Sequence, residues 1–530
     1  MRIGDPVDVC IVGCGPAGAV LGAALVRDGV RVLVLESGPR FPFSERPKAQ
    51  RNYLRGVDPW EAMPEAFYAS SSRGPIYYRL QGRHVRGVGG TSLHWGGDTP
   101  RFQANDFRLR SLYGVGDDWP IGYAELEPYY VLAERQLGVS GGEDPFASPR
   151  SAPYPMPPHP LNYLDQTIVR SAAKLGLRFS PVPQARNSQP YQGRSQCQGC
   201  GTCTVCPVGA KASVDLTHVP LIDQSDHGLV VENVTVLRLE TDAGERVRRA
   251  VYAGLDRVEH AVDADVFVVG AGAIETPRLL LLSTSRNFPG GLANRSNLVG
   301  KRFMEHLVCG LEGTVTERAY VERISFNTTA CNQFWDTPAR AERSGFSIQI
   351  PTGNGQTPGW MAERSEVWGD ELSRSIQRDF GHAIRLESPI EILPNDRNQV
   401  DLDPDLRDYF GNPAPRIYVS SGQYEDDGMK AAWDMQRRIL EAHGAKAVSP
   451  GGRGPDPGFW SHQSGTCRMG TDATASVVDQ NLRCHDVPNL YLLGSSVFVT
   501  VGMANPTLTI AALALRLADH LLANRHGGTP

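Results

Sequence analysis

The chain has 530 residues, which is too long for a single hydrophobic core, so we expect at least two domains. Hydrophobic residues make up 41% and charged residues 21% of the sequence, as in ordinary globular proteins. The formal net charge of −5 argues against nucleic acid or an anionic membrane surface as a partner. The most apolar stretches are interrupted by Gly, Pro, Asn or Thr, so no membrane-spanning helix is expected.

The first forty residues predict a dinucleotide-binding βαβ unit. Val7–Val12 alternates and then runs apolar, and it is rich in β-branched side chains, which is typical of a buried strand. The glycine-rich turn Gly13–Gly18 follows at once, and Ala19–Arg27 is a small, apolar helix. A second strand, Val30–Leu35, ends at the acidic Glu36. These parts occur in the order that the G-x-G-x-x-G unit requires.

Each residue of this motif has a physical role at a nucleotide. Gly13 permits the tight turn, and Gly15 lets the backbone approach a pyrophosphate at the N-terminus of the helix. Gly18 lets the helix pack closely against the strand, and the Glu36 carboxylate can accept hydrogen bonds from a ribose hydroxyl. The alternative is a glycine-rich tight turn that binds no ligand.

A second glycine-rich stretch follows residues 41–80, which contain scattered prolines and aromatic residues and are expected to be irregular. It spans Arg86–Phe102 and contains Gly89-Gly90-Thr91-Ser92 and then Leu93-His94-Trp95. So many glycines indicate backbone that lies close against a ligand. The bulky residues inside the stretch argue against a flexible surface loop.

The next part of the chain predicts an amphipathic helix, a surface connection and a cysteine cluster. The helix is expected at Tyr123–Leu137, and the proline-rich and polar residues 151–192 are expected to cross the surface. Four cysteines then lie close together while six are scattered, which is no disulfide framework and favours a reducing compartment. The four are Cys197, Cys200, Cys203 and Cys206.

The spacing of this cluster is C-x2-C-x2-C-x2-C-P, which resembles the bacterial ferredoxin run except that its last interval is two residues instead of three. Four such thiolates could hold an iron–sulfur cluster or zinc. The remaining alternative is a set of reduced cysteines or local disulfides without metal.

Strands and a third glycine turn follow. Leu229–Leu239 and Asp265–Val269 are expected to be strands, and the second leads through the turn Gly270–Arg278 into the helical residues Leu279–Leu282. Residues 310–460 alternate polar and apolar side chains in short segments, which predicts an antiparallel sheet in a second domain.

The last segment, Phe459–Leu522, combines a histidine motif with a strand, a loop and a helix. His462 lies in Ser-His-Gln-Ser-Gly-Thr, the strand is expected at Leu490–Gly494, and the helix is expected to begin at Pro506. Proline suits the first turn of a helix, because the N–H that it lacks would have no helical partner there.

Together these motifs resemble the glucose–methanol–choline (GMC) family of flavin oxidoreductases. They occur in family order over nearly the whole chain, and residues 310–460, where the family varies with substrate, have no match. Within the family, Gly-Gly-Thr-Ser-Leu-His-Trp and Asn-Pro-Thr-Leu-Thr-Ile are most similar to the sugar branch of bacterial sugar and gluconate dehydrogenases and pyranose oxidases. The matching pieces are Gly13–Gly18 with Glu36, Gly89–Ser92, Asp118–Ile121, Gly270–Arg278, Ser461–Gly470, Pro488–Tyr491 and the helix 505–522.

The resemblance implies an α/β fold and FAD as the nucleotide. A Rossmann-like FAD-binding domain would comprise residues 1–309 and 459–530, with a cysteine-rich insertion at about 190–212, and a substrate-binding domain with an antiparallel sheet would comprise 310–458. The N-terminus of the last helix would direct its partial positive charge at the flavin. The implied FAD-binding residues are Gly13, Gly15, Gly18, Glu36, Gly89, Gly90, Thr91, Ser92, His94, Val236, Gly272, Gly494, Asn505 and Pro506.

The resemblance also implies oxidation of a secondary hydroxyl of a sugar, sugar acid or glycoside to a ketone, with the hydride passing to flavin N5. His462 matches the catalytic base of the family, and a near-neutral imidazole suits that role. Asn505 matches the second residue of the pair and can hydrogen-bond the same hydroxyl without competing for its proton. The alternatives are an oxidase of a sterol or aromatic alcohol that uses oxygen, a flavin-binding lyase, and a structural subunit without turnover.

Polar residues on the expected strands of the second domain favour a sugar substrate. These are Arg323, Asn327, Gln349 and Arg385. His94 falls where some relatives attach FAD covalently and where similar dehydrogenases keep a histidine without the bond, so both arrangements stay open.

The partners and the compartment depend on the cysteine cluster. Similar sugar dehydrogenases hold an iron–sulfur cluster in this region, although with different cysteine spacing. A cluster would imply an electron-acceptor protein or a small subunit as partner, whereas oxygen or a soluble quinone is favoured without one. We expect a cytoplasmic protein, because cleavage of the apolar segment after Arg2 as a signal peptide would destroy the nucleotide motif. Periplasmic export on a partner subunit is the alternative.

Overall fold

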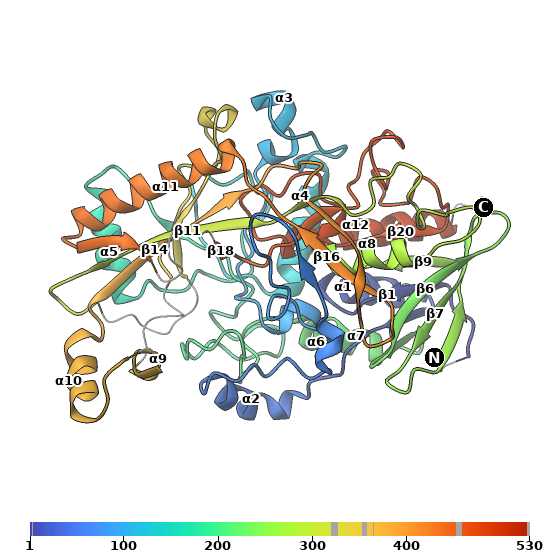
Figure 1. The fold of residues 1–530 in the computed structure, drawn as a ribbon, viewed down its shortest axis with the longest axis horizontal. Coiled ribbons are helices and arrows are strands. Elements are labelled where there is room, and N and C mark those ends of the chain that lie inside the picture. The colour runs from blue at the N-terminus through green and yellow to red at the C-terminus, as the bar shows by residue number, and fades with distance from the viewer. Residues whose placement is uncertain (3, 320–326, 352–357, 364, 452–457, 527–530) are drawn as a thin grey trace.

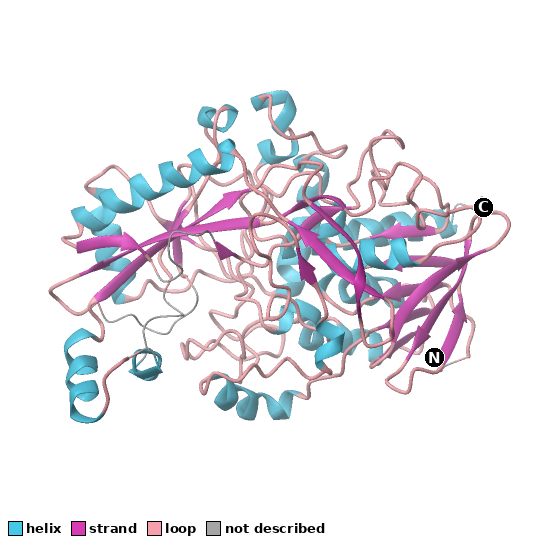
Figure 2. Ribbon diagram, viewed as in Figure 1, coloured by secondary structure: helices cyan, strands magenta, loops and turns pink. Residues whose placement is uncertain are grey.

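A computed structural model describes residues 1–2, 4–319, 327–351, 358–363, 365–451 and 458–526 of the chain (Figure 1). Long antiparallel strands and the long helix α11 lie at one end of the molecule, and a parallel sheet with its helices lies at the other. Figure 2 shows helices and strands interleaved over the whole molecule, which confirms the predicted α/β class.

A five-stranded parallel sheet, in the order β20–β9–β1–β2–β5, forms the core of the nucleotide-binding half. All four residues of β1 are buried, because a parallel strand covered on both faces needs a continuous apolar run. The last strand in the chain, β20, pairs with β9, so the C-terminal segment returns to this sheet. The strands are β1 (Val9–Val12), β2 (Val32–Leu35), β5 (Gly228–Val231), β9 (Val266–Val269) and β20 (Leu490–Leu492).

Helix α1 (Pro16–Arg27) follows the glycine turn and packs on strands β1 and β2 of this sheet. It also contacts α12 (Thr507–His526). α12 also contacts α4 (Tyr123–Leu137), whose predicted bounds are confirmed. α8 (Gly272–Leu282) follows β9 as predicted, but it begins at Gly272, within the segment that was expected to be a turn.

The predicted strand Leu229–Leu239 is two strands in the structure. It divides between β5 and β6 (Thr235–Thr241), and Asn233 between them has a left-handed backbone with φ of 59°. Asparagine tolerates this conformation, so the chain can leave one sheet and enter another. β6 pairs with β7 (Val247–Ala253), which pairs with β8 (Glu259–Asp263), to form a three-stranded antiparallel sheet.

The antiparallel sheet predicted for residues 310–460 is confirmed, and β11 (His306–Thr314) and β14 (Ala383–Glu391) form its centre. The sequence prediction missed α11 (Gln423–Ala442), which packs on β11 and β14. Its buried residues Met429, Ala432, Ile439 and Leu440 recur at helical spacing, and this pattern in the sequence indicates a helix. The other strands are β4 (Ser180–Pro181), β12 (Thr329–Cys331), β13 (Ile348–Gln349), β17 (Lys446–Pro450) and β18 (Gly458–Phe459).

A further sheet, in the order β19–β10–β15–β16–β3, takes its strands from distant segments of the chain. The boundary between the two expected domains stays a prediction. The strands are β3 (Ser71–Ser72), β10 (Lys301–Met304), β15 (Gln399–Arg407), β16 (Pro413–Tyr418) and β19 (Ser464–Thr466).

Two segments predicted to lack regular structure contain helices. α2 (Arg46–Tyr53) has Pro47 in its first turn, where proline is tolerated, so the prolines of 41–80 do not exclude a helix. α5 (Tyr163–Ala173) lies within 151–192 and begins at a capping box formed by Asn162 and Asp165.

The remaining helices are short. No helix in the described ranges is long and apolar enough to cross a membrane. The α-helices are α3 (Leu109–Tyr113), α6 (Val214–Thr217), α7 (Val219–Asp223), α9 (Pro358–Glu363) and α10 (Gly369–Asp379), and the 3-10 helices are Phe43–Glu45, Glu65–Tyr68, Gly90–Leu93, Ala104–Phe107, Pro338–Ala341 and Ser495–Val497.

Candidate active site

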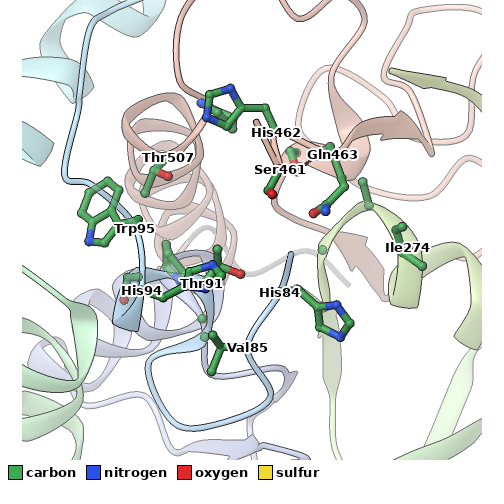
Figure 3. Close-up of a pocket in the computed structure, with 18 of the residues that line it drawn as sticks. His84, Val85, Thr91, His94, Trp95, Ile274, Ser461, His462, Gln463 and Thr507 are labelled. Atoms are coloured by element: carbon green, nitrogen blue, oxygen red, sulfur yellow. Dashed lines mark hydrogen bonds between the residues drawn. The ribbon is translucent and has the colours of Figure 1, made fainter. Parts of the chain in front are cut away.

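A cavity of about 780 Å³ extends from the nucleotide motif to the antiparallel sheet. The β1–α1 turn, the loop 84–98 and the start of α8 line one part, while strands β11 and β14 and residues 459–463 line another. In Figure 3, His462 lies across the open space from Thr91 and His94. Of the predicted FAD-binding residues, all except Gly18 and Gly89 line this cavity. The residues that line it are Gly13, Gly15, Glu36, Gly90, Thr91, Ser92, His94, Val236, Gly272, Gly494, Asn505 and Pro506.

The first glycine turn has the geometry that its motif predicts. Gly13 has a φ of 98°, which favours glycine over residues with a side chain. A Cβ on Gly18 would lie 2.0 Å from the Gly13 carbonyl oxygen, so Gly18 serves the packing of α1 on β1. Gly15 occupies the N-cap position of α1, and no side chain in the described residues caps it. The first N–H groups of α1 are therefore available to an anion in the cavity.

The second glycine loop lies directly on the first. A Cβ on Gly90 would lie 2.7 Å from the Gly15 Cα, so the two backbones meet at this point. Gly89 does not line the cavity, but it joins the two turns, because its N–H donates to the Cys14 carbonyl oxygen at 2.9 Å. Lys211 holds the same loop, since its buried amino group donates to the backbone oxygens of Leu93 at 2.9 Å and Trp95 at 2.8 Å.

Glu36 is buried at the end of β2 and lines the cavity. Its carboxylate accepts the N–H of Cys14 at 2.8 Å and the N–H of Gly38 at 3.0 Å. Burial raises the pKa of Glu36, and these two hydrogen bonds favour the ionised form. Oε1 also accepts the hydroxyl of Ser37 at 3.3 Å, so Oε2 is the oxygen that keeps a further lone pair, which fits the predicted contact with a ribose hydroxyl.

His84 is a lining residue that sequence reasoning missed. Both ring nitrogens are buried and, among the described residues, neither has a hydrogen-bond partner. Burial lowers the pKa of His84 to about 4, so the ring is neutral at physiological pH. A buried imidazole without a partner in a cavity fits a site that a polar ligand completes. A lone histidine beside a glycine-rich stretch gave no sequence signal for this position.

His462 and Asn505 meet at the far side of the cavity from the glycine turns. Asn505 Nδ2 lies 3.2 Å from His462 Nε2, and both side chains line the cavity. The opposite ring nitrogen, His462 Nδ1, lies 2.7 Å from His306 Nδ1. Burial, with the nearby His306, keeps the pKa of His462 below its usual range, so the ring is neutral and able to accept a proton.

Glu305 fixes the backbone on both sides of this histidine pair. Its carboxylate accepts the backbone N–H groups of His462 and His306, and the hydroxyl of Tyr78 at 2.7 Å. Burial raises the pKa of Glu305 to about 7. Glu305 and His306 were not predicted from the sequence, because they lie more than 150 positions from His462 and no motif links them.

The substrate-domain end of the cavity is polar. Three of the four residues predicted to favour a sugar line it, and Asn327 Nδ2 donates to Gln349 Oε1 at 2.6 Å. Arg385, the third, forms an ion pair with Glu387 at 2.5 Å. Arg323, the fourth, lies outside the described residues.

The predicted metal ligands lie near one another in the chain but do not form a ligand set. Arg186 Nη1 lies 3.5 Å from Cys197 Sγ and 4.0 Å from Cys203 Sγ, and Cys206 Sγ accepts the backbone N–H of Lys211 at 3.4 Å. The described residues contain no group of three or more His, Cys, Asp or Glu side chains arranged to hold a metal ion. The structure therefore does not support the iron–sulfur or zinc site expected on Cys197, Cys200, Cys203 and Cys206.

The fold and the cavity fit a dinucleotide-binding protein, and comparisons with known proteins show its family. Residues 150–308 and 394–514 match the family models described as GMC oxidoreductase, and residues 6–52 match an FAD-binding domain. The chain thus belongs to the GMC oxidoreductase family, and FAD is its nucleotide.

Named relatives cover nearly the whole chain. The chain is 35% identical to the fructose dehydrogenase large subunit of Gluconobacter japonicus, over 97% of both chains. It is 31% identical to the 2-methyl-1,2-propanediol dehydrogenase of Mycolicibacterium austroafricanum, over 98% of this chain and 95% of the relative. The pyridoxine 4-oxidase structure from Mesorbium loti has the same fold, with a TM-score of 0.69 and 19% identity over 98% of this chain and 99% of that one.

Proposed function

We propose that the chain oxidises a secondary hydroxyl of a sugar, sugar acid or glycoside to a ketone, with His462 as the base and Asn505 as its partner. The observation behind this proposal is the His462–Asn505 pair, whose polar atoms are 3.2 Å apart on the wall of the cavity that begins at the nucleotide motif. A base and a hydrogen-bond donor thus face the space next to the site for the oxidant.

The residues present fit FAD. The uncapped N-terminus of α1 suits the pyrophosphate, Glu36 suits the ribose, and the close contact of Gly90 with Gly15 suits a loop laid over the cofactor. The unpartnered ring of His84 is a further polar group for it. Bound FAD supplies an acceptor for the hydride that leaves the carbinol carbon.

The chain itself moves the proton. His462 Nε2 takes the proton of the substrate hydroxyl, and Asn505 Nδ2, which contacts Nε2 in the structure, turns its hydrogen bond to the substrate oxygen and fixes its position. Loss of this proton and of the hydride removes two electrons from the alcohol and leaves a carbonyl group. Asn505 has no proton to lose at physiological pH, so the two side chains do not compete as bases.

The substrate class follows from the polar wall. Asn327, Gln349, Arg385 and Glu387 offer donors and acceptors for several hydroxyl groups, which favours a sugar over an apolar alcohol. The name of the fructose dehydrogenase relative supports the same class. A non-sugar alcohol is the second candidate, and the name of the 2-methyl-1,2-propanediol dehydrogenase supports it.

The electron acceptor and the partner of the chain are proposed from its relatives. The fructose dehydrogenase relative is named a large subunit, which supports a second subunit or another electron-accepting protein as partner of this chain. Cell fractionation distinguishes the two compartments: the complex is recovered from the periplasm if the chain is exported on its partner, and from the cytoplasm if it is retained.

The test is an anaerobic screen in which bleaching of the flavin is followed by absorbance. D-fructose, D-glucose, D-gluconate and 2-methyl-1,2-propanediol are the probes, and rapid bleaching by a sugar is the expected result. His462→Ala should keep its FAD but reduce it about 10²–10⁴-fold more slowly, because the base is lost. His260→Ala, at an exposed position on β8, is the matched control and should react like the wild type. Normal bleaching in His462→Ala would refute the assignment, and turnover with the flavin still oxidised would indicate a lyase.

A further inference from the structure

A second histidine lies behind the candidate base and is fully buried. His306 is the first residue of β11, and its Nδ1 lies 2.7 Å from His462 Nδ1. Its other ring nitrogen, Nε2, lies 2.7 Å from the backbone oxygen of Gly502. The two imidazole planes are nearly perpendicular, at 87°. Between two ring nitrogens this close, one must donate a proton and the other must accept it.

The Gly502 carbonyl decides which nitrogen donates. A carbonyl oxygen can only accept, so His306 Nε2 must carry a hydrogen. Burial lowers the pKa of His306 to about 4, so the ring is neutral and has a single N–H. His306 Nδ1 is consequently an acceptor. His462 Nδ1 must then carry the hydrogen of that contact, and His462 Nε2 is left with its lone pair.

We propose that His306 is a positioning residue that holds His462 in the tautomer with hydrogen on Nδ1, so that Nε2 is the proton-accepting atom. This inference rests on the proposed function, because it assigns a role to a partner of the proposed base. It explains how Asn505 Nδ2, a donor, comes to point at His462 Nε2: that nitrogen is an acceptor.

The surroundings keep this chain of contacts in place. Glu305 accepts the backbone N–H groups of both histidines. The N–H of Gly502 donates to Glu391 Oε1 at 2.9 Å. This hydrogen bond holds the backbone of Gly502, whose carbonyl oxygen contacts His306. His306 is therefore held from its backbone side and at its ring, and rotation of either ring would break two contacts at once.

The same contact serves the proton transfer itself. When His462 Nε2 takes the hydroxyl proton, the ring becomes an imidazolium with hydrogens on both nitrogens. Its Nδ1–H already points at an acceptor, His306 Nδ1, so the positive charge forms with a hydrogen bond in place. No hydrogen has to move between the two histidines for the step to be complete.

Two variants separate the acceptor from the donor of His306. His306→Asn places an amide oxygen where Nδ1 lies, so it can still accept from His462 Nδ1–H. His306→Gln places its amide group where Nε2 lies, so it can donate to Gly502 but offers His462 no acceptor. The readouts are the rate constant of flavin reduction at saturating D-fructose, or at whichever probe sugar bleaches the wild-type flavin fastest, and ¹⁵N NMR of histidine-labelled, flavin-loaded protein without substrate.

The expected result is a loss of about 10- to 100-fold in His306→Gln against about threefold in His306→Asn, with KM nearly unchanged, since only part of the base's 10²–10⁴-fold contribution is removed. In the NMR spectrum, the signals that disappear in His462→Ala should show an unprotonated Nε2 in the wild type. A protonated Nε2 there, or equal rates in the two variants, would overturn the role of His306. A full rate in His462→Ala would overturn the proposed function instead.

Discussion

Gln184 donates a hydrogen bond from Nε2 to Asp98 Oδ1 across 3.0 Å, and it thereby joins the cavity wall to the cysteine segment. Gln184 Oε1 accepts from the guanidinium of Arg186, whose Nη1 faces the sulfur atoms of Cys197 and Cys203. Asp98, Gln184 and Arg186 are all buried. A continuous polar chain thus connects a cavity carboxyl group with two thiols, and the carboxyl group is the member whose protonation can be tested directly.

Replacement of Asp98 by asparagine should remove a pH dependence of stability. Burial raises the pKa of Asp98 to about 7, although Gln184 and Arg186 oppose the shift. In the unfolded chain the pKa is about 3.9, so between these values the native state holds a proton that the unfolded state has lost. The native state is thereby favoured at low pH, and this advantage is lost as the pH rises to about 7.

The measurement is urea unfolding of the wild type and Asp98→Asn at pH 5 and pH 8. The free energy of unfolding of the wild type, relative to the variant, should fall by about 2–3 kcal/mol between the two conditions. All other titrating groups are shared by the two proteins and cancel in the difference. A difference that does not change with pH would show that Asp98 is ionised at pH 5 in the folded protein.

Alanine at the glycines of the two turns should remove the flavin. A Cβ on Gly18 would lie 2.0 Å from a backbone oxygen, so Gly18→Ala must displace α1 from β1, at a cost of about 1–3 kcal/mol. Gly90→Ala would force the second loop away from Gly15. Both variants should bind less FAD, measured as visible absorbance per polypeptide after purification.

The control for these variants is Gly122→Ala, just before α4. Among the described residues, no heavy atom lies within 4 Å of the place where its Cβ would be. It should keep a full complement of FAD. Retention of FAD in Gly18→Ala at the level of this control would contradict the predicted role of the first turn.

The nucleotide half of the site was predictable because its parts are neighbours in the sequence. Gly13, Gly15, Gly18 and Glu36 belong to one βαβ unit, and the spacing alone determines which backbone groups approach a ligand. The resemblance to a known family then supplied His462 and Asn505, which the structure brings to 3.2 Å.

The residues that sequence reasoning missed are those placed by long-range strand pairing. β18 pairs with β11 through Phe459 opposite Leu307, and this register brings His306 beside His462. No local pattern contains such a register, since it depends on how two distant segments share a sheet. The cysteine segment is the opposite case, because its regular spacing in the sequence is not matched by a group of three or more ligands among the described residues, and the metal site stays unsupported.

Arg340 supports the loop that presents Asn505, and its loss should destabilise the fold. Its fully buried guanidinium pairs with Asp106 at 2.8 Å and with Glu391 at 3.0 Å, and Glu391 also holds the N–H of Gly502. Arg340→Met would leave two buried carboxylates without their cation. The free energy of unfolding should fall by about 3–5 kcal/mol, as for other broken buried ion pairs.

Chemical denaturation with the flavin bound measures this loss. Arg249→Met is the matched control, because Arg249 pairs with Asp263 at the surface, and such pairs contribute little. It should unfold like the wild type. Arg340→Met that unfolds at the same denaturant concentration as Arg249→Met would show that the buried network is not what holds the loop.

The ion pair at the substrate end should determine how the cavity treats an anionic sugar. Arg385 is bound to Glu387 at 2.5 Å and lies opposite Glu312 in the β11–β14 register, so its positive charge is offset by carboxylates. Glu387→Gln would leave more of this charge for a substrate carboxylate. D-gluconate should then inhibit oxidation of a neutral sugar about tenfold more strongly, which is roughly the contribution of one charge-assisted hydrogen bond. The KM of the neutral sugar should change much less, because its hydroxyls do not need the full charge.

The double variant Arg385→Gln/Glu387→Gln is the control. Its inhibition by D-gluconate should not be stronger than that of the wild type, because the positive charge is absent. An unchanged inhibition constant in Glu387→Gln would show that this pair does not face the substrate.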